Sequence, residues 1–130
     1  MGGRQATARR PKTAAARRFK EEAASDLVAR EIAIEPGGCT GWHYHQVPLI
    51  AVVKSGTLTR VLHDGTVEVH RTGTSFVEPA GIHHVHLGRN LGPEPVVLCV
   101  TAALAEGAPF ALPADAPPGA TPCACPTRTR

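Results

Sequence analysis

The sequence of 130 residues predicts an all-β fold, either a β-sandwich or a small β-barrel. Three observations support this class. Short runs alternate apolar and polar residues, glycine and proline separate these runs, and the central part of the chain has no helical periodicity. Only residues 14–24 have a pattern compatible with a helix.

The expected strands follow one another at short intervals. The first covers residues 27–35, which alternate in polarity and end at Pro36-Gly37-Gly38. A short apolar run at 49–53 gives the next strand and stops at Ser55-Gly56. After the hairpin described below, further strands are expected at 75–78, 84–88 and 96–102.

Residues 57–63 and 66–71 predict a β-hairpin. Asp64-Gly65 joins these two alternating runs, and Asp-Gly is a strong hairpin signal. The expected connection is a type I′ turn, in which both central residues have positive φ.

Charge and proline divide the chain into three parts. The net charge of +3 combines +7 in the first twenty residues with −4 in the remaining 110, and the basic part predicts a disordered tail over residues 1–24. Six of the twelve prolines lie within residues 107–130, which predicts an extended tail that lies over the domain through Phe110 and Leu112. Residues 25–106 remain as one folded domain.

Several classes of protein are excluded by composition. No apolar run approaches the ~20 residues of a membrane helix. Nucleic-acid binding is not expected, because the basic charge belongs to the tail and lacks stacking aromatic residues. No secretory signal pattern is seen, and the four cysteines do not form a disulfide framework, so reduced thiols and a cytoplasmic location are expected. Cys39 is expected to be structural, and Cys123 and Cys125 to have no role in a flexible tail.

Five of the seven histidines form two clusters: His43 and His45, then His83, His84 and His86. Residues i and i+2 of a strand share a face, so each His-x-His pair presents two imidazoles together. Two such pairs brought together in a barrel would form a nitrogen-rich metal site, and imidazole suits Fe, Zn, Cu and Ni.

The arrangement of these histidines resembles the two motifs of the cupin family. The first motif is Gly, five residues, His-x-His, three or four residues, Glu, six residues, Gly, and the chain matches at Gly37, His43, His45 and Gly56, with Leu49 in the glutamate position. The second is Gly, five residues, Pro-x-Gly, two residues, His, and the chain matches at Gly73, Pro79, Gly81 and His84. The asparagine that usually follows, Asn90, lies two positions late.

The resemblance implies a small antiparallel β-barrel of the jelly-roll type that holds a metal on His43, His45 and His84. His86 is either a fourth ligand or a neighbour that contacts substrate. Gln46 and Glu78 are weaker substitutes for the missing glutamate, since alternation turns Gln46 away and Glu78 sits beside Pro79.

The function implied is that of a mononuclear non-heme Fe(II) dioxygenase or other oxygenase that acts on a small organic molecule through a three-His site. Zn, Mn, Ni or Cu are alternative metals. A non-redox isomerase, lyase or cyclase and a non-catalytic binding protein are alternative functions. A homodimer is expected, with Trp42 and Tyr44 facing outward against the partner or the N-terminal strand. The expected pocket residues are Ile50, Val52, Leu58 and Val100.

Overall fold

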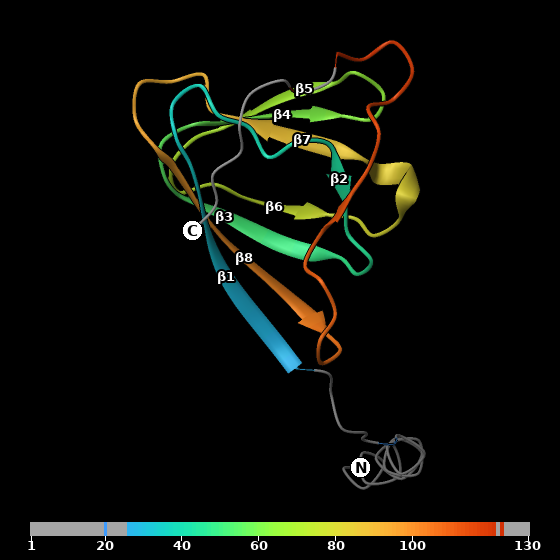
Figure 1. The fold of residues 1–130 in the computed structure, drawn as a ribbon. Helices are drawn as coiled ribbons and strands as arrows, with labels where there is room; N and C mark the ends of the chain where they lie inside the picture. Colours follow the sequence, from blue (N-terminus) through green and yellow to red (C-terminus); the bar gives the residue numbers. More distant parts are fainter. Residues whose placement is uncertain (1–19, 21–25, 122, 124–130) are drawn as a thin grey trace, which may run out of the picture.

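Two antiparallel sheets pack face to face in the computed structural model, which describes Lys20, residues 26–121 and Cys123 (Figure 1). The all-β class and the jelly-roll architecture are confirmed. The elements are β1 (Asp26–Ile34), β2 (His43–Tyr44), β3 (Leu49–Ser55), β4 (Leu58–Leu62), β5 (Val67–His70), β6 (Ser75–Glu78), the 3₁₀ turn η1 (Ile82–His84), β7 (His86–Arg89), β8 (Val96–Leu104) and β9 (Leu112–Pro113). The expected tail at 1–24 and helical pattern at 14–24 lie outside the described residues, apart from Lys20.

The strand order places the histidine-bearing strands side by side. One sheet has the order β1-β8-β3-β6, and the other has β5-β4-β7-β2-β9. β2 and β7 are therefore neighbours, although more than forty residues separate them in the sequence. No helix in the described part of the chain has the length and apolarity needed to cross a membrane.

The core lies between the sheets and is built from alternate residues of β3 and β8. On β3, Leu49, Ala51 and Val53 are buried, whereas 54% of Ile50 and 38% of Val52 is exposed. The expectation that Ile50 and Val52 line the pocket is therefore wrong. Residues 49–53 are all apolar, so alternation within them does not show which set faces inward; Lys54, on the same face as Ile50 and Val52, marks the exposed side.

The hairpin is confirmed, but its turn differs from the one expected. β4 pairs with β5, with Val61 opposite Val67. Gly65 has a φ of 86°, whereas Asp64 has no positive φ, so the turn is not type I′. The Asp64 carboxylate instead accepts a hydrogen bond from the Thr66 amide at 3.0 Å. The result is a type I turn followed by a left-handed glycine, which is the common three-residue hairpin loop.

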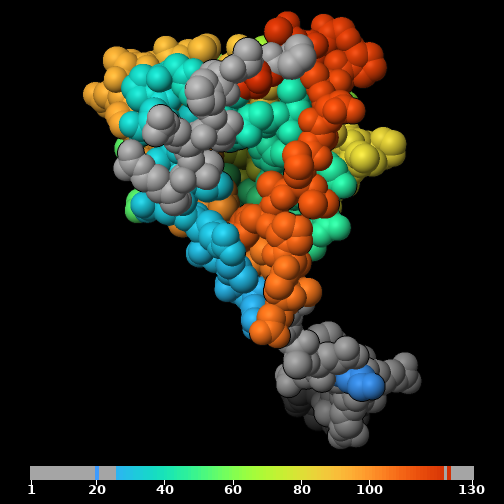
Figure 2. Space-filling model, in the orientation of Figure 1, coloured from blue at the N-terminus to red at the C-terminus, as the bar shows by residue number. Residues whose placement is uncertain are grey.

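The proline-rich segment after β8 folds back along the outside of the barrel beside β2 (Figures 1 and 2). Leu112 in β9 pairs with Tyr44, and Phe110 packs against the core, as the sequence suggested. Trp42 is buried against this segment and donates a hydrogen bond from Nε1 to the Thr121 carbonyl at 3.2 Å. Trp42 and Tyr44 thus pack against the chain's own C-terminal segment.

A disulfide joins Cys39 to Cys123 and fastens this segment to the barrel. The expectation of reduced thiols is therefore wrong for this pair. The two cysteines are 84 residues apart in sequence, and only the return of the C-terminal segment brings them together. Among the described cysteines, Cys99 is free, and Cys125 lies outside the described residues.

Candidate metal centre

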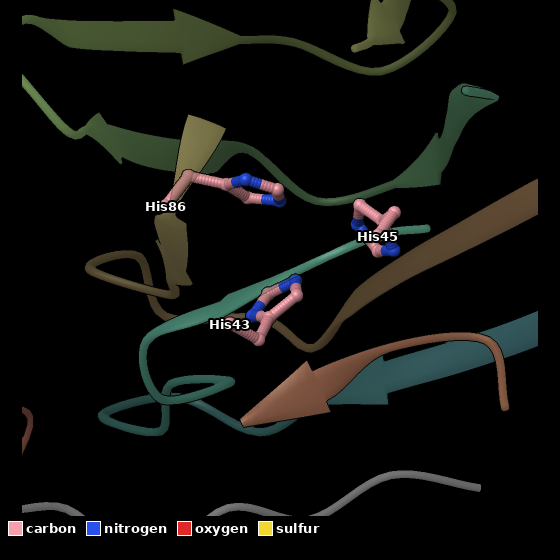
Figure 3. Close-up of side chains that lie close together, drawn as sticks. All are labelled: His43, His45 and His86. Carbon is pink, nitrogen blue, oxygen red and sulfur yellow. The ribbon is translucent and has the colours of Figure 1, made fainter. Parts of the chain in front are cut away.

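Three histidines converge between the sheets (Figure 3). His43 lies on β2, His45 is the first residue after β2, and His86 is the first residue of β7. One ligand nitrogen from each lies within 4.8 Å of the others. The i, i+2 spacing of His43 and His45 thus brings both rings to the same site, as the sequence predicts.

The backbone holds all three rings by their Nδ1 atoms. The partners are the carbonyl oxygens of Gly41 for His43 at 2.9 Å, Phe110 for His45 at 2.8 Å and His84 for His86 at 2.8 Å. A carbonyl only accepts hydrogen bonds, so each Nδ1 carries the hydrogen and each Nε2 is directed to the site. Metal-binding histidines are commonly oriented in this way.

His84 does not join this group, which corrects the assignment made from the motif. It lies in η1, with its ring 5.7 Å from that of His63. The expected strand at 84–88 begins only at His86, because the 3₁₀ turn η1 occupies residues 82–84 after Gly81. The late position of Asn90 was the available signal, since a two-residue insertion before the histidine shifts both histidine and asparagine. His84 contributes its carbonyl instead of its ring.

Asn90 fixes the position of the end of β7. It is fully buried, and its Nδ2 donates to the carbonyls of Ile34 at 2.9 Å and Glu94 at 2.7 Å. Its Oδ1 accepts from the Gly92 amide at 3.0 Å. Asn90 therefore has a structural role and anchors the end of β7 to β1.

Glu78 is the site residue that sequence reasoning set aside. It is buried at the end of β6, and its carboxylate enters the histidine group instead of turning away at Pro79. Oε1 lies 3.0 Å from His45 Nε2, and Oε2 lies 2.9 Å from His86 Nε2. Buried Arg60 reaches the same carboxylate at 3.1 Å, binds Glu68 at 2.7 Å and lies over the Phe76 ring.

The charges in this site depend on burial and on these contacts. Burial, together with the nearby His86, lowers the pKa of His43 to about 4, so its ring is neutral at pH 7. Burial lowers the pKa of His45, but the contacts with Glu78 and the Phe110 carbonyl outweigh it and raise the pKa overall. Burial also opposes ionisation of Glu78, yet the hydrogen bond to His45 and the close contact with His86 hold its pKa well below the usual range.

A cavity of about 280 Å³ opens beside the three histidines. Its wall is mainly apolar and includes Leu58 and Val100, as the sequence predicts. Phe110 and Pro113 of the C-terminal segment also contribute to this wall. A small organic molecule with one or two polar groups fits such a space.

The donor set suits a divalent metal ion. Three imidazole nitrogens converge, and each ring is oriented by a hydrogen bond from its other nitrogen. His86 Nε2 is buried and has no hydrogen-bond partner, since its contact with Glu78 is not aligned as a hydrogen bond. A buried nitrogen in this state is explained by a ligand role.

The fold and the site together define a jelly-roll protein with a three-histidine centre for a divalent metal. The family model for the cupin domain matches residues 30–102, and the chain belongs to the cupin family. No curated protein matches the sequence significantly.

Solved structures support the same fold. A protein with a double-stranded β-helix domain from Klebsiella pneumoniae is 24% identical, with a TM-score of 0.56 over 67% of this chain and 75% of that one. A structure from a study of DMSP lyases is 21% identical, with a TM-score of 0.59 over 68% of this chain and 44% of that one. The polyketide cyclase RemF from Streptomyces resistomycificus is 26% identical, with a TM-score of 0.54 over 62% and 56% of the two chains. The chain thus spans about half the length of the last two.

Proposed function

We propose that this protein is a mononuclear metal enzyme, specifically an Fe(II) dioxygenase or related oxidoreductase that acts on a small organic substrate. The observation that carries the proposal is the convergence of three backbone-oriented imidazoles beside a largely apolar cavity. The titratable side chains that line the described cavity are these three histidines, Glu78 and Arg60. Glu78 is already engaged by histidine and arginine, so no separate acid–base pair is present there.

The chain's own residues would hold the metal, shape the cavity and limit access of water. His43, His45 and His86 are the proposed ligands, and the C-terminal segment covers the site through Phe110 and Pro113. When bound, Fe(II) supplies the redox chemistry with dioxygen that protein side chains lack. The apolar wall favours a substrate whose polar groups are directed toward the metal and whose remaining atoms are hydrocarbon.

A non-redox cupin enzyme is the second candidate, and the similarity to a polyketide cyclase favours it. In this case the metal would act as a Lewis acid, and Zn²⁺, Mn²⁺ or Ni²⁺ would serve. The two candidates differ in whether dioxygen is consumed.

Metal analysis and oxygen uptake test the proposal. We would purify the protein without a histidine tag, measure its metal content, load it with Fe(II) and add diketones, catechols and small thiols in an oxygen electrode. We expect one iron per chain and oxygen uptake with at least one substrate class, both lost in His43→Ala. Stoichiometric Zn or Mn with no oxygen uptake after iron loading would favour the second candidate.

Two other proposals accompany this function. We propose a homodimer, which is tested in the Discussion. The cytoplasmic location stays a prediction, and its premise of reduced cysteines does not hold for Cys39 and Cys123.

A further inference from the structure

We propose that Glu78 is the fourth metal ligand, a carboxylate supplied by β6 in place of the glutamate that Leu49 replaces on β3. This inference rests on the proposed metal function and deepens it. The centre would then hold three neutral imidazoles and one anionic oxygen, not three imidazoles alone.

The contacts of Glu78 are those of a ligand. Its two oxygens lie 3.0 Å from His45 Nε2 and 2.9 Å from His86 Nε2. Two ligand atoms at right angles around a metal, each bonded at about 2.1 Å, are about 3.0 Å apart. The carboxylate is therefore at a ligand-to-ligand distance from both histidines.

The hydrogen-bond accounting also favours a positive charge at this place, either a proton on the imidazole or a metal ion. The Nδ1 atoms of His45 and His86 already donate to carbonyls. In the neutral rings each Nε2 therefore carries no hydrogen and offers a lone pair. A carboxylate oxygen offers only lone pairs as well. Two acceptors at about 3 Å repel each other unless a proton or a metal ion lies between them. One divalent ion satisfies both imidazoles and the carboxylate together.

The pairing of β3 with β6 explains how a glutamate on β6 can take the place of a glutamate on β3. Leu49 and Glu78 are direct partners in this antiparallel pair. Directly opposed residues project to the same face of the sheet, with Cβ atoms about 5 Å apart. Both side chains are buried and both line the cavity. A glutamate at either position would therefore reach the same site.

Arg60 supports the negative charge in the buried site. Its Nη2 lies 3.1 Å from Glu78 Oε2, while its Nη1 binds Glu68 at 2.7 Å. A buried carboxylate is stable only when paired, and Arg60 keeps it ionised and oriented when no metal is present. Glu68 gives a matched control, since it also binds Arg60 but contacts none of the three site histidines; the histidine it binds is His70, at 3.0 Å.

Cobalt(II) provides a test that is independent of activity, because its visible spectrum reports the ligand set. We would titrate Co(II) into metal-free wild type, Glu78→Gln and the control Glu68→Gln, with folding checked by circular dichroism. We expect Glu78→Gln to bind at least about tenfold more weakly and with a changed spectrum, and Glu68→Gln to match wild type. A wild-type spectrum and affinity in Glu78→Gln would overturn the inference.

Moving the glutamate from position 78 to position 49 tests whether the carboxylate is a metal ligand or only positions a histidine. We expect Glu78→Leu to lose tight binding and the double variant Leu49→Glu/Glu78→Leu to recover it. A folded double variant that binds no better than Glu78→Leu would overturn the inference. Loss of metal in His86→Ala, with Glu78→Gln unaffected, would leave the proposed function intact. A wild-type protein that binds no divalent metal would defeat the proposed function itself.

Discussion

His43 and His86 are direct partners across the antiparallel pair β2–β7, and their ring centroids are 4.4 Å apart. The register of this pair therefore decides which histidine of the second cluster enters the site. Because Asn90 anchors the end of β7 and η1 takes up the residues before it, His86 has this position and His84 does not.

The first prediction concerns these two histidines. His86→Ala removes a ligand and should weaken metal binding by more than about 100-fold, which exceeds the usual effect of an outer residue. His84→Ala keeps the carbonyl that orients His86 and should retain wild-type metal content. Metal analysis after dialysis and the rise in Tm on adding metal measure the difference. Equal loss in both variants would show that the assignment of His86 over His84 is mistaken.

The second prediction concerns the Cys39–Cys123 disulfide. Cys123→Ser should lower the free energy of unfolding by about 2–4 kcal/mol, because the disulfide closes a long loop. Reduction of wild type by dithiothreitol should cause a similar loss, whereas the variant should not respond to dithiothreitol. Cys99→Ser is the control, since Cys99 is free. Identical urea denaturation midpoints for reduced and oxidised wild type would contradict the stabilising role.

The third prediction compares two glycines with positive φ. Gly56 has a φ of 77°, and an added Cβ would lie 2.5 Å from the Pro95 carbonyl oxygen. Gly65 has a φ of 86°, but an added Cβ meets nothing within 4 Å. Gly65→Ala should therefore cost only about 1 kcal/mol of backbone strain, and Gly56→Ala about 3 kcal/mol or more. Thermal unfolding checks this order, and equal costs would refute the steric argument at Gly56.

The fourth prediction tests the homodimer. Ile50 and Val77 are partners on the outer face of the four-stranded sheet, with 54% and 61% of their surfaces exposed. Burying such apolar surface against a second copy is favourable. Ile50→Lys should shift the mass in light scattering from dimer to monomer. Val67→Lys, at an exposed site on the other sheet, should not, and a monomeric wild type would disprove the proposal.

Local patterns in the sequence determined much of the fold. Alternation and glycine or proline breaks predicted the β class, the hairpin and most strands, because these signals depend on neighbouring residues. The spacing of His43 and His45 on one strand face likewise required no knowledge of distant residues. The phase of β3 was misassigned because residues 49–53 are all apolar, and only Lys54 at the end of the strand marks the face of Ile50 and Val52 as the exposed one.

The tertiary structure alone decided the remaining members of the site. His86 entered because strand register and a 3₁₀ turn placed it opposite His43. Glu78 lies in the site because β6 pairs with β3. The Phe110 carbonyl lies there because the C-terminal segment returns over the barrel. Each of these contacts joins residues far apart in sequence. Such contacts are fixed by how the sheets pair and pack as a whole, and local spacing contains no record of that pairing.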